Sequence, residues 1–203
     1  MLLSLNDIFI YFVMKPFFFS PVQICLSTLL SLAALPAFAQ VCTGQVISTP
    51  DGMHEVQDES LLKAALGEPG KGSLCTAKVF EVDKPVRLFR VYNAAQPASL
   101  YGRWWSLQVP VGPRTQYAAE NAICPEWSPL NAAATCTLKP GVRVVIGPGQ
   151  SAQCASGEVL PASATNQVYV ANDARAQKTL VDNCSEPLVW PWYLALIRSA
   201  PCG

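Results

Sequence analysis

The sequence is poor in the residue types that most catalytic sites use. It has a single histidine, His54, in the polar stretch PDGMHEV, and we expect an exposed loop residue there rather than a catalytic base. It contains no GxSxG motif, and the glycine fingerprints of phosphate and dinucleotide loops are missing as well. A serine triad, a cysteine–histidine pair and a nucleotide-binding loop are therefore all poorly supported.

An excess of charge of either sign is also lacking. The chain has 14 basic and 14 acidic residues, whereas a protein that binds nucleic acid usually carries a clustered basic excess. No cysteine pair has CxxC spacing, and one histidine is too few for a typical zinc site. We therefore expect no nucleic-acid partner and no metal.

A long hydrophobic run is present only near the N-terminus. Lys15 precedes a nearly apolar stretch from Pro16 to Leu35, and Ala37 and Ala39 place small residues at both positions that a signal peptidase reads. The pattern predicts a signal peptide over residues 14–39, cleavage after Ala39, and a secreted or periplasmic protein. A membrane anchor is the alternative, but no basic stop-transfer cluster follows, so we expect no stable membrane insertion.

Seven cysteines remain after the predicted cleavage. In an exported domain they indicate about three disulfides and one thiol left over. Their spacing does not fix the pairing. Cys202 is the first candidate for the unpaired thiol, and a Cys184–Cys202 clasp is an equally natural arrangement.

The chain divides by composition into five parts. Residues 1–13 are interpreted as an over-called start, because Met14 is a more natural one. After the signal peptide we expect an N-terminal extension over 40–77, a central domain over 78–184 and an apolar, aromatic tail over 185–203.

The local patterns predict an α+β fold: a compact mixed β-sheet with a few short helices, stabilised by disulfides. Proline, glycine, valine and aromatic residues are frequent, and long amphipathic runs are missing. We expect strands over 78–82, 86–93, 102–109, 135–138, 142–146 and 167–171, and helices over 60–66, 115–123 and 174–183.

The segment LFRVYNAAQPASLYGRWWS, residues 88–106, has the strongest features of a site. Arg90 lies within a strand-forming run, where a charge is costly to bury unless something pairs with it. A fixed guanidinium suits recognition of phosphate or carboxylate, and a surface arginine on an edge strand is the equal alternative. Trp104 and Trp105 are candidates for ligand stacking or simply core and surface neighbours on a strand.

The order of LFRVYN, YGRWWSL, a helix and QVYV resembles the ADP-ribosyltransferase and NAD-glycohydrolase toxin fold. It is most similar to the polymorphic-toxin branch, whose members have motifs close to YRVY, GxWW[ST], PEW and Qx[FY]. The likeness runs from about Val79 to Val170. It implies a toxin-like catalytic domain over 78–184 that has NAD as its substrate.

The resemblance also implies three catalytic residues. Arg90 takes the place of the arginine that binds the NAD phosphate and ribose, and Ser106 that of the serine that shapes the nicotinamide pocket. Gln167 takes the place of the late-strand residue near the nicotinamide ribose. The family's transfer to arginine acceptors goes with a glutamate pair, so glutamine favours NAD hydrolysis or transfer to an unusual acceptor.

Four further residues are expected to bind the NAD by the same resemblance: Tyr101, Gly102, Trp104 and Trp105. The partners it implies are NAD itself and a protein acceptor or toxin partner subunit. The alternative is a non-enzymatic exported binding or inhibitor domain with an aromatic interaction patch, a reading that the apolar tail PLVWPWYLALI also supports.

The stretch ICPEWS supplies a second candidate region. Glu126 and Trp127 suit the edge of a pocket, where Glu126 would be a further acidic contributor. The favoured alternative is a disulfide-anchored loop whose Trp127 fills the core.

Overall fold

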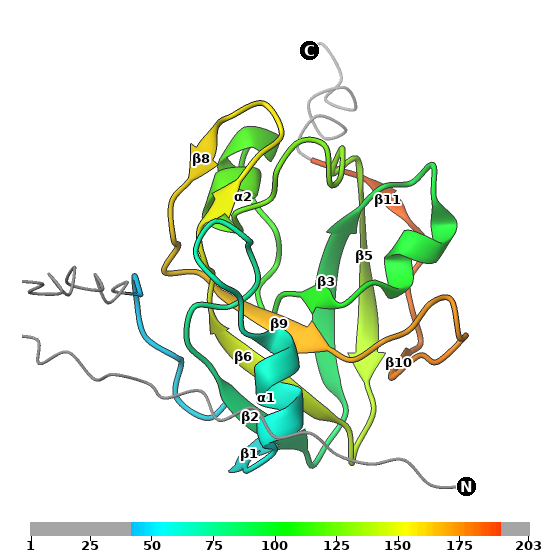
Figure 1. Ribbon diagram of the computed structural model, residues 1–203. Coiled ribbons are helices and arrows are strands. Elements are labelled where there is room, and N and C mark those ends of the chain that lie inside the picture. The colour runs from blue at the N-terminus through cyan, green and yellow to red at the C-terminus, as the bar shows by residue number, and fades with distance from the viewer. Residues whose placement is uncertain (1–41, 192–203) are drawn as a thin grey trace, which may run out of the picture. The chain divides into compact units, whose positions relative to one another are not determined.

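A computed structural model describes residues 42–191 (Figure 1). The expected signal peptide, the expected over-called start and Cys202 lie outside the described residues. Within them, the chain forms mostly antiparallel β-sheet with two short α-helices and three disulfides, as expected for a compact α+β domain.

The larger sheet has five antiparallel strands. Their spatial order is β1 (Met53–Val56), β2 (Lys78–Val82), β6 (Arg143–Pro148), β9 (Asn166–Val170) and β4 (Trp104–Trp105). The short strand β4 therefore forms one edge of this sheet, next to β9.

The second sheet is built around β5 (Ala132–Leu138). It pairs along its whole length with β3 (Val86–Tyr92), while β10 (Val181–Asp182) and β11 (Leu188–Val189) pair with its two ends. A separate hairpin joins β7 (Ala152–Gln153) to β8 (Val159–Leu160).

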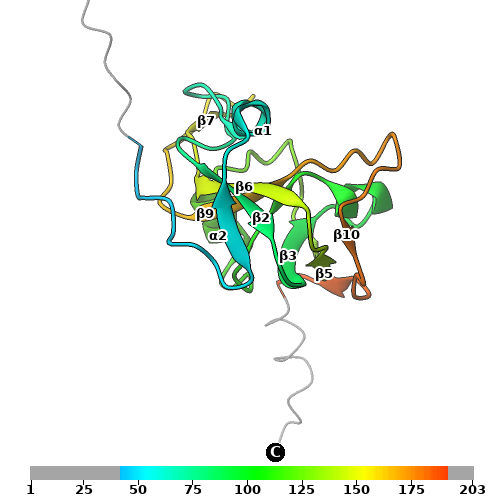
Figure 2. The same cartoon turned by 90° about the horizontal axis from the view of Figure 1, so that it is seen from below.

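Three short helices complete the fold: α1 (Glu59–Ala65), the 3-10 helix η1 (Pro97–Tyr101) and α2 (Arg114–Glu120). Asp58 caps α1, because its Oδ1 accepts a hydrogen bond from the Leu61 N–H at 3.0 Å. Figure 2 shows α1, the strands β2 and β6, and then β3 and β5 as successive layers.

Alternating side chains of the larger sheet face two different neighbours. On β6, Val144 and Ile146 face the main core between the two sheets, whereas Val145 packs with Ala65 of α1. The same alternation places Val168 in the main core on β9 and Tyr169 on the α1 side. This period of two follows from strand geometry, and it decides where the site residues point.

The two sheets meet at the residue that follows β4. Ser106 donates its N–H to the Phe89 carbonyl at 2.9 Å and accepts the Phe89 N–H at 2.8 Å. Residues 104–106 thus pair first with β9 of the larger sheet and then with β3 of the smaller one. We call this place the seam.

Three disulfides link Cys42 to Cys75, Cys124 to Cys154 and Cys136 to Cys184. The expected number is confirmed. The expected Cys184–Cys202 clasp is wrong, because Cys184, in the segment after β10, forms its disulfide with Cys136 of β5. Three disulfides indicate a fold that forms in an oxidising, exported environment.

Most expected elements are present, with shifted ends. The strand over 102–109 is reduced to two residues, and the helix over 174–183 is wrong. There, the Asp173 side chain accepts hydrogen bonds from two backbone N–H groups, and a bridge to Lys178 closes a tight turn before β10. None of the helices within residues 42–191 combines the length and the apolar character that a membrane-spanning segment requires.

Part of the expected tail belongs to the fold. Residues Leu188 and Val189 form β11 and stay exposed, but Trp190 is completely buried against the ring of Tyr117. In the same way, the expected N-terminal extension supplies both β1 and α1.

Candidate functional site

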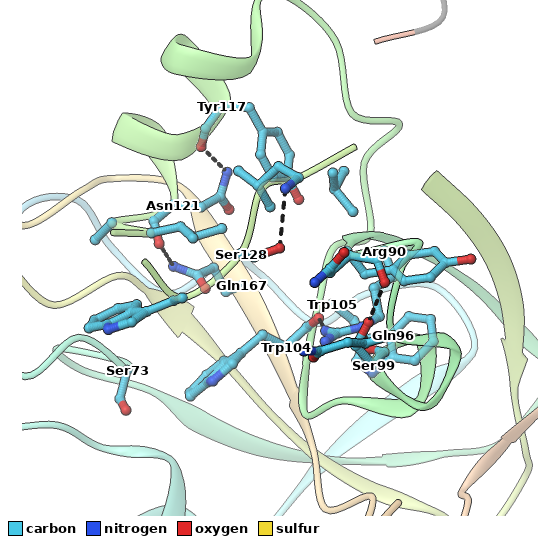
Figure 3. Close-up of a pocket in the computed structure, with 17 residues that line it drawn as sticks. Ser73, Arg90, Gln96, Ser99, Trp104, Trp105, Tyr117, Asn121, Ser128 and Gln167 are labelled. Carbon is cyan, nitrogen blue, oxygen red and sulfur yellow. Dashed lines mark hydrogen bonds between the residues drawn. The ribbon is translucent and has the colours of Figure 1, made fainter. Parts of the chain in front are cut away.

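A cavity of about 190 Å³ opens beside the seam (Figure 3). Its walls come from β3, the following loop with η1, β4, the end of α2, the loop after Cys124, and the start of β9. The polar and aromatic residues that line it are Ser73, Arg90, Tyr92, Asn93, Gln96, Ser99, Trp104, Trp105, Tyr117, Asn121, Trp127, Ser128 and Gln167. Four of the residues proposed from the sequence therefore meet here: Arg90, Trp104, Trp105 and Gln167.

Arg90 is a partly buried cation whose protein partners are all neutral. Its Nε donates to the Ser99 carbonyl at 2.8 Å and its Nη1 to the Trp104 carbonyl, and its guanidinium lies 5.6 Å from the centre of the Trp105 ring. Desolvation lowers its pKa to about 10. Among the described residues, no carboxylate forms an ion pair with it. The arrangement therefore leaves a positive charge to be balanced by an anion.

Gly102 makes room for this guanidinium. A Cβ added to Gly102 would lie 1.9 Å from Nη2 of Arg90 and 2.6 Å from its Cζ. Gly102 and Tyr101, both expected to bind the ligand, are not among the residues that line the cavity. The structure gives Gly102 an indirect part, because it lets Arg90 occupy its position.

The two tryptophans have different surroundings. Trp105 is buried in the main core, and its indole N–H donates to the Gly102 carbonyl at 2.8 Å. Trp104 is partly exposed and packs edge-on against Tyr169, with 5.2 Å between ring centres. Both tryptophans line the cavity. Trp105 is therefore a core residue and a cavity residue at once, whereas Trp104 offers the more accessible aromatic surface.

Ser106 lies at the seam and not in the cavity wall. Its hydroxyl donates to the Gln108 carbonyl at 3.0 Å and accepts the Gln108 N–H at 2.9 Å. Both of these bonds fix the turn after β4, next to Trp105. In this structure the serine holds the backbone of the site.

Gln167 reaches the cavity from the larger sheet. The side chain is buried, and its Nε2 donates to the Asn121 carbonyl at 3.1 Å (Figure 3). Asn121 ends α2, and its own Nδ2 donates to the Tyr117 carbonyl at 2.9 Å. Gly149 leaves space for the glutamine, because a Cβ there would lie 2.8 Å from Nε2. These contacts fix the amide against the end of α2.

Tyr117 is a site residue that the sequence did not reveal. It comes from α2, lines the cavity and packs edge-on against Trp190 at 5.0 Å. Desolvation raises the pKa of its phenol to about 12, and the nearby Arg90 charge partly opposes this shift. A tyrosine in a short amphipathic helix carries no distinguishing signal. Its place depends on how the helix docks at the seam.

The loop that carries Trp127 also borders the cavity. Cys124 anchors it by the disulfide to Cys154, and Oε1 of Glu126 accepts the Ala155 N–H at 2.6 Å. Trp127 keeps 50% of its surface exposed. The expected disulfide anchor of the loop is confirmed, but the expectation that Trp127 fills the core is wrong. Trp127 lies at the edge of the cavity, whereas Glu126 does not line it.

The donor groups in the described part of the chain offer little to a metal. Cys124, Glu126 and Cys154 lie close enough together to share an ion, but the two sulfurs are joined in a disulfide. A thiolate is the form of cysteine that binds metal. His54 lies away from the cavity lining on β1, where its Nδ1 is 2.9 Å from Asp83 Oδ1.

The cavity can therefore bind and orient, but it offers no obvious proton acceptor. Its lining residues include no aspartate, glutamate or histidine. It provides one desolvated cation, several aromatic faces, and hydroxyl and amide groups. This set suits a ligand that combines an anionic group with a flat ring.

Comparisons with known proteins add no relative. No family model matches the chain, and neither the curated proteins nor the solved structures give a match.

Proposed function

We propose that this protein is an exported, toxin-like enzyme that binds NAD and cleaves its nicotinamide–ribose bond. The bond is cleaved by hydrolysis or by ADP-ribosyl transfer to an acceptor. One observation carries the proposal: Arg90 from one sheet and Gln167 from the other lie at the same cavity, between aromatic walls. The disulfides support export, and the signal peptide over residues 14–39 is the proposed route.

The charge of Arg90 accounts for the anionic part of the substrate. A guanidinium held by neutral carbonyls and partly removed from water gains most from a phosphate or pyrophosphate. Its Nε and Nη1 are already occupied by the Ser99 and Trp104 carbonyls, which fix its plane. The phosphate would then be bound in one orientation, which positions the rest of the ligand.

The aromatic walls account for the nicotinamide. The accessible ring of Trp104 and the partly buried phenol of Tyr117 both border the cavity. A cationic pyridinium ring interacts favourably with aromatic faces.

Cleavage develops positive charge on the ribose, in an oxocarbenium-like transition state. Nicotinamide leaves as a neutral base with the bonding electron pair. In hydrolysis, water then adds to the ribose and releases one proton, which gives ADP-ribose. The Gln167 amide oxygen can orient a ribose hydroxyl or that water, but it cannot take the proton. Gln167 therefore acts by positioning, and Ser106 supports the site through the seam.

The test is nicotinamide release by the oxidised chain that begins at Gln40. Wild type should consume NAD. Arg90→Ala should lower kcat/KM by about a hundredfold, and Gln167→Ala should lower kcat by about as much. Arg87→Ala is the matched control, because Arg87 is an exposed arginine on the same strand. It should keep wild-type activity.

Two outcomes would reject the proposal. One is a wild-type protein that releases no nicotinamide, with or without a protein extract as acceptor. The other is activity that survives both site substitutions. The first outcome would favour the exported binding domain, for which the exposed Leu188 and Val189 on β11 are one candidate surface.

A further inference from the structure

The cavity at the seam is too small for a whole dinucleotide. It offers about 190 Å³, whereas sites that enclose a drug-sized ligand measure about 300–1,000 Å³. It can enclose only part of the dinucleotide. The rest must then lie on the surface outside.

A second hollow adjoins the cavity. It measures about 540 Å³ and is lined by residues 69–71, Glu126, Trp127 and residues 153–155. Trp127 is shared by the two spaces, since it also lines the cavity at the seam. Lys71 and Glu126 are the charged side chains of the hollow, and Lys71 forms no ion pair with another described residue.

Trp127 is held in place although it is exposed. Gly72 lies against its six-membered ring: a Cβ added to Gly72 would be 3.1 Å from Cη2. The backbone N–H of Trp127 donates to the Cys124 carbonyl at 2.9 Å, and the Cys124–Cys154 disulfide closes the loop. A large aromatic ring fixed before binding loses little entropy when a flat ligand stacks on it.

We propose that this hollow is the site for the second nucleotide of the substrate, with its nucleobase stacked on Trp127. Lys71 faces the phosphates from the hollow, as Arg90 does from the cavity. The proposal rests on the proposed function, because it takes NAD as the ligand. It explains why Trp127 stays exposed beside two hollows.

The experiment compares two substrates that share the scissile bond. NAD has the adenosine half, and nicotinamide mononucleotide lacks it. Trp127→Ala should raise KM for NAD by about ten- to a hundredfold, because base stacking on an aromatic side chain is lost. KM for nicotinamide mononucleotide should rise by a much smaller factor, because Trp127 only borders the cavity that holds this half. Trp127→Phe should restore most of the NAD affinity.

Leu188→Ala is the matched control, since Leu188 is exposed but lines neither hollow. It should change neither KM. Equal changes in KM for both substrates with Trp127→Ala, or no change for NAD, would overturn the proposal and leave the proposed function standing.

A separate titration with AMP tests the hollow without catalysis. The indole N–H signal of Trp127 should shift as AMP binds, and Trp127→Ala should weaken AMP binding by about tenfold or more. If the wild type releases no nicotinamide, the proposed function fails, and this titration still shows whether the hollow binds a nucleotide. AMP that leaves the Trp127 signal unmoved would overturn it.

Discussion

At the scale of single residues, the site depends on a positive charge that the fold holds without neutralising it. Arg90 is surrounded by two carbonyl groups and an indole face. These contacts accept hydrogen bonds from the guanidinium but bring no negative charge to it. The folded protein is therefore destabilised by the desolvation of this cation, and an anionic ligand would offset that cost. Gly102 is part of the same arrangement, because the guanidinium occupies the space where a side chain would be.

We expect Gly102→Ala to destabilise the protein through Arg90. Gly102 has φ −70° and ψ −178°, which alanine adopts without strain, and the three atoms nearest to an added Cβ all belong to the Arg90 guanidinium. The loss should be about 1–3 kcal/mol of unfolding free energy, as for other overpacked sites, and nicotinamide release should fall with it. Chemical denaturation measures the first effect.

The Arg90→Ala background provides the control for this prediction. Without the guanidinium, the nearest atoms that the added methyl group would meet are gone, and Gly102→Ala should cost much less there. An equal cost in both backgrounds would show that Arg90 does not occupy the space beside Gly102.

At the scale of elements, the sequence predicts the parts with strong local patterns. The strand over 78–82 is confirmed residue for residue, and β3, β6 and β9 differ from expectation only at their ends. These strands are rich in β-branched and aromatic residues, and this local pattern is visible in the sequence without knowledge of the strands that pair with them. The short strands were not predicted, because β10 and β11 have two residues each and exist only through pairing with β5.

The same reason limits what could be predicted of the site. Arg90 stands out in the sequence as a charge within a strand-forming run, whereas Gln167 was predicted only through the family resemblance, from its place ahead of the late strand. Tyr117 and Asn121 belong to the site because α2 docks beside β9, and no local pattern encodes that docking. The helix expected over 174–183 failed since Asp173 and Asn172 bond to nearby backbone N–H groups and close a turn instead.

The Cys124–Cys154 disulfide should matter for binding as well as for stability. It anchors the loop that carries Trp127 and Ser128 into the cavity wall. Replacing both cysteines by alanine should lower the unfolding free energy by about 2–5 kcal/mol. KM for NAD should also rise, because the loop is no longer fixed before the ligand binds.

The Cys136–Cys184 pair is the comparison. It joins β5 to the segment after β10 and borders neither hollow. Its removal should cost similar stability with little effect on KM. A rise in KM of the same size in both variants would show that the first disulfide has no specific link to the binding site.

At the scale of the whole molecule, two aspartates set part of the acid limit of stability. The Leu61 N–H bonded to Asp58, and the Ala176 N–H bonded to Asp173, hold the pKa of each carboxyl below its ordinary value of 3.8. A lowered folded-state pKa stabilises the protein fully above that value, and the contribution is lost as pH falls through the folded-state pKa. The unfolding free energy should therefore fall below about pH 3.8.

The double variant Asp58→Asn with Asp173→Asn tests this origin of the acid limb. Asparagine still accepts the backbone hydrogen bonds but does not titrate. The decline measured by denaturation at a series of acid pH values should become shallower. If the unfolding free energy of the variant falls as steeply with pH as that of the wild type, other carboxyl groups cause the decline.

The position of the cavity at the seam has a consequence for how the domain responds to its ligand. Arg90 belongs to the sheet built on β5, and Gln167 to the sheet that ends in β4. A molecule held by both side chains joins the two sheets as a reversible cross-link, beside the three covalent ones. Under the proposed function, bound NAD would stabilise the folded chain in proportion to its occupancy, and the protein would resist unfolding best where NAD is abundant.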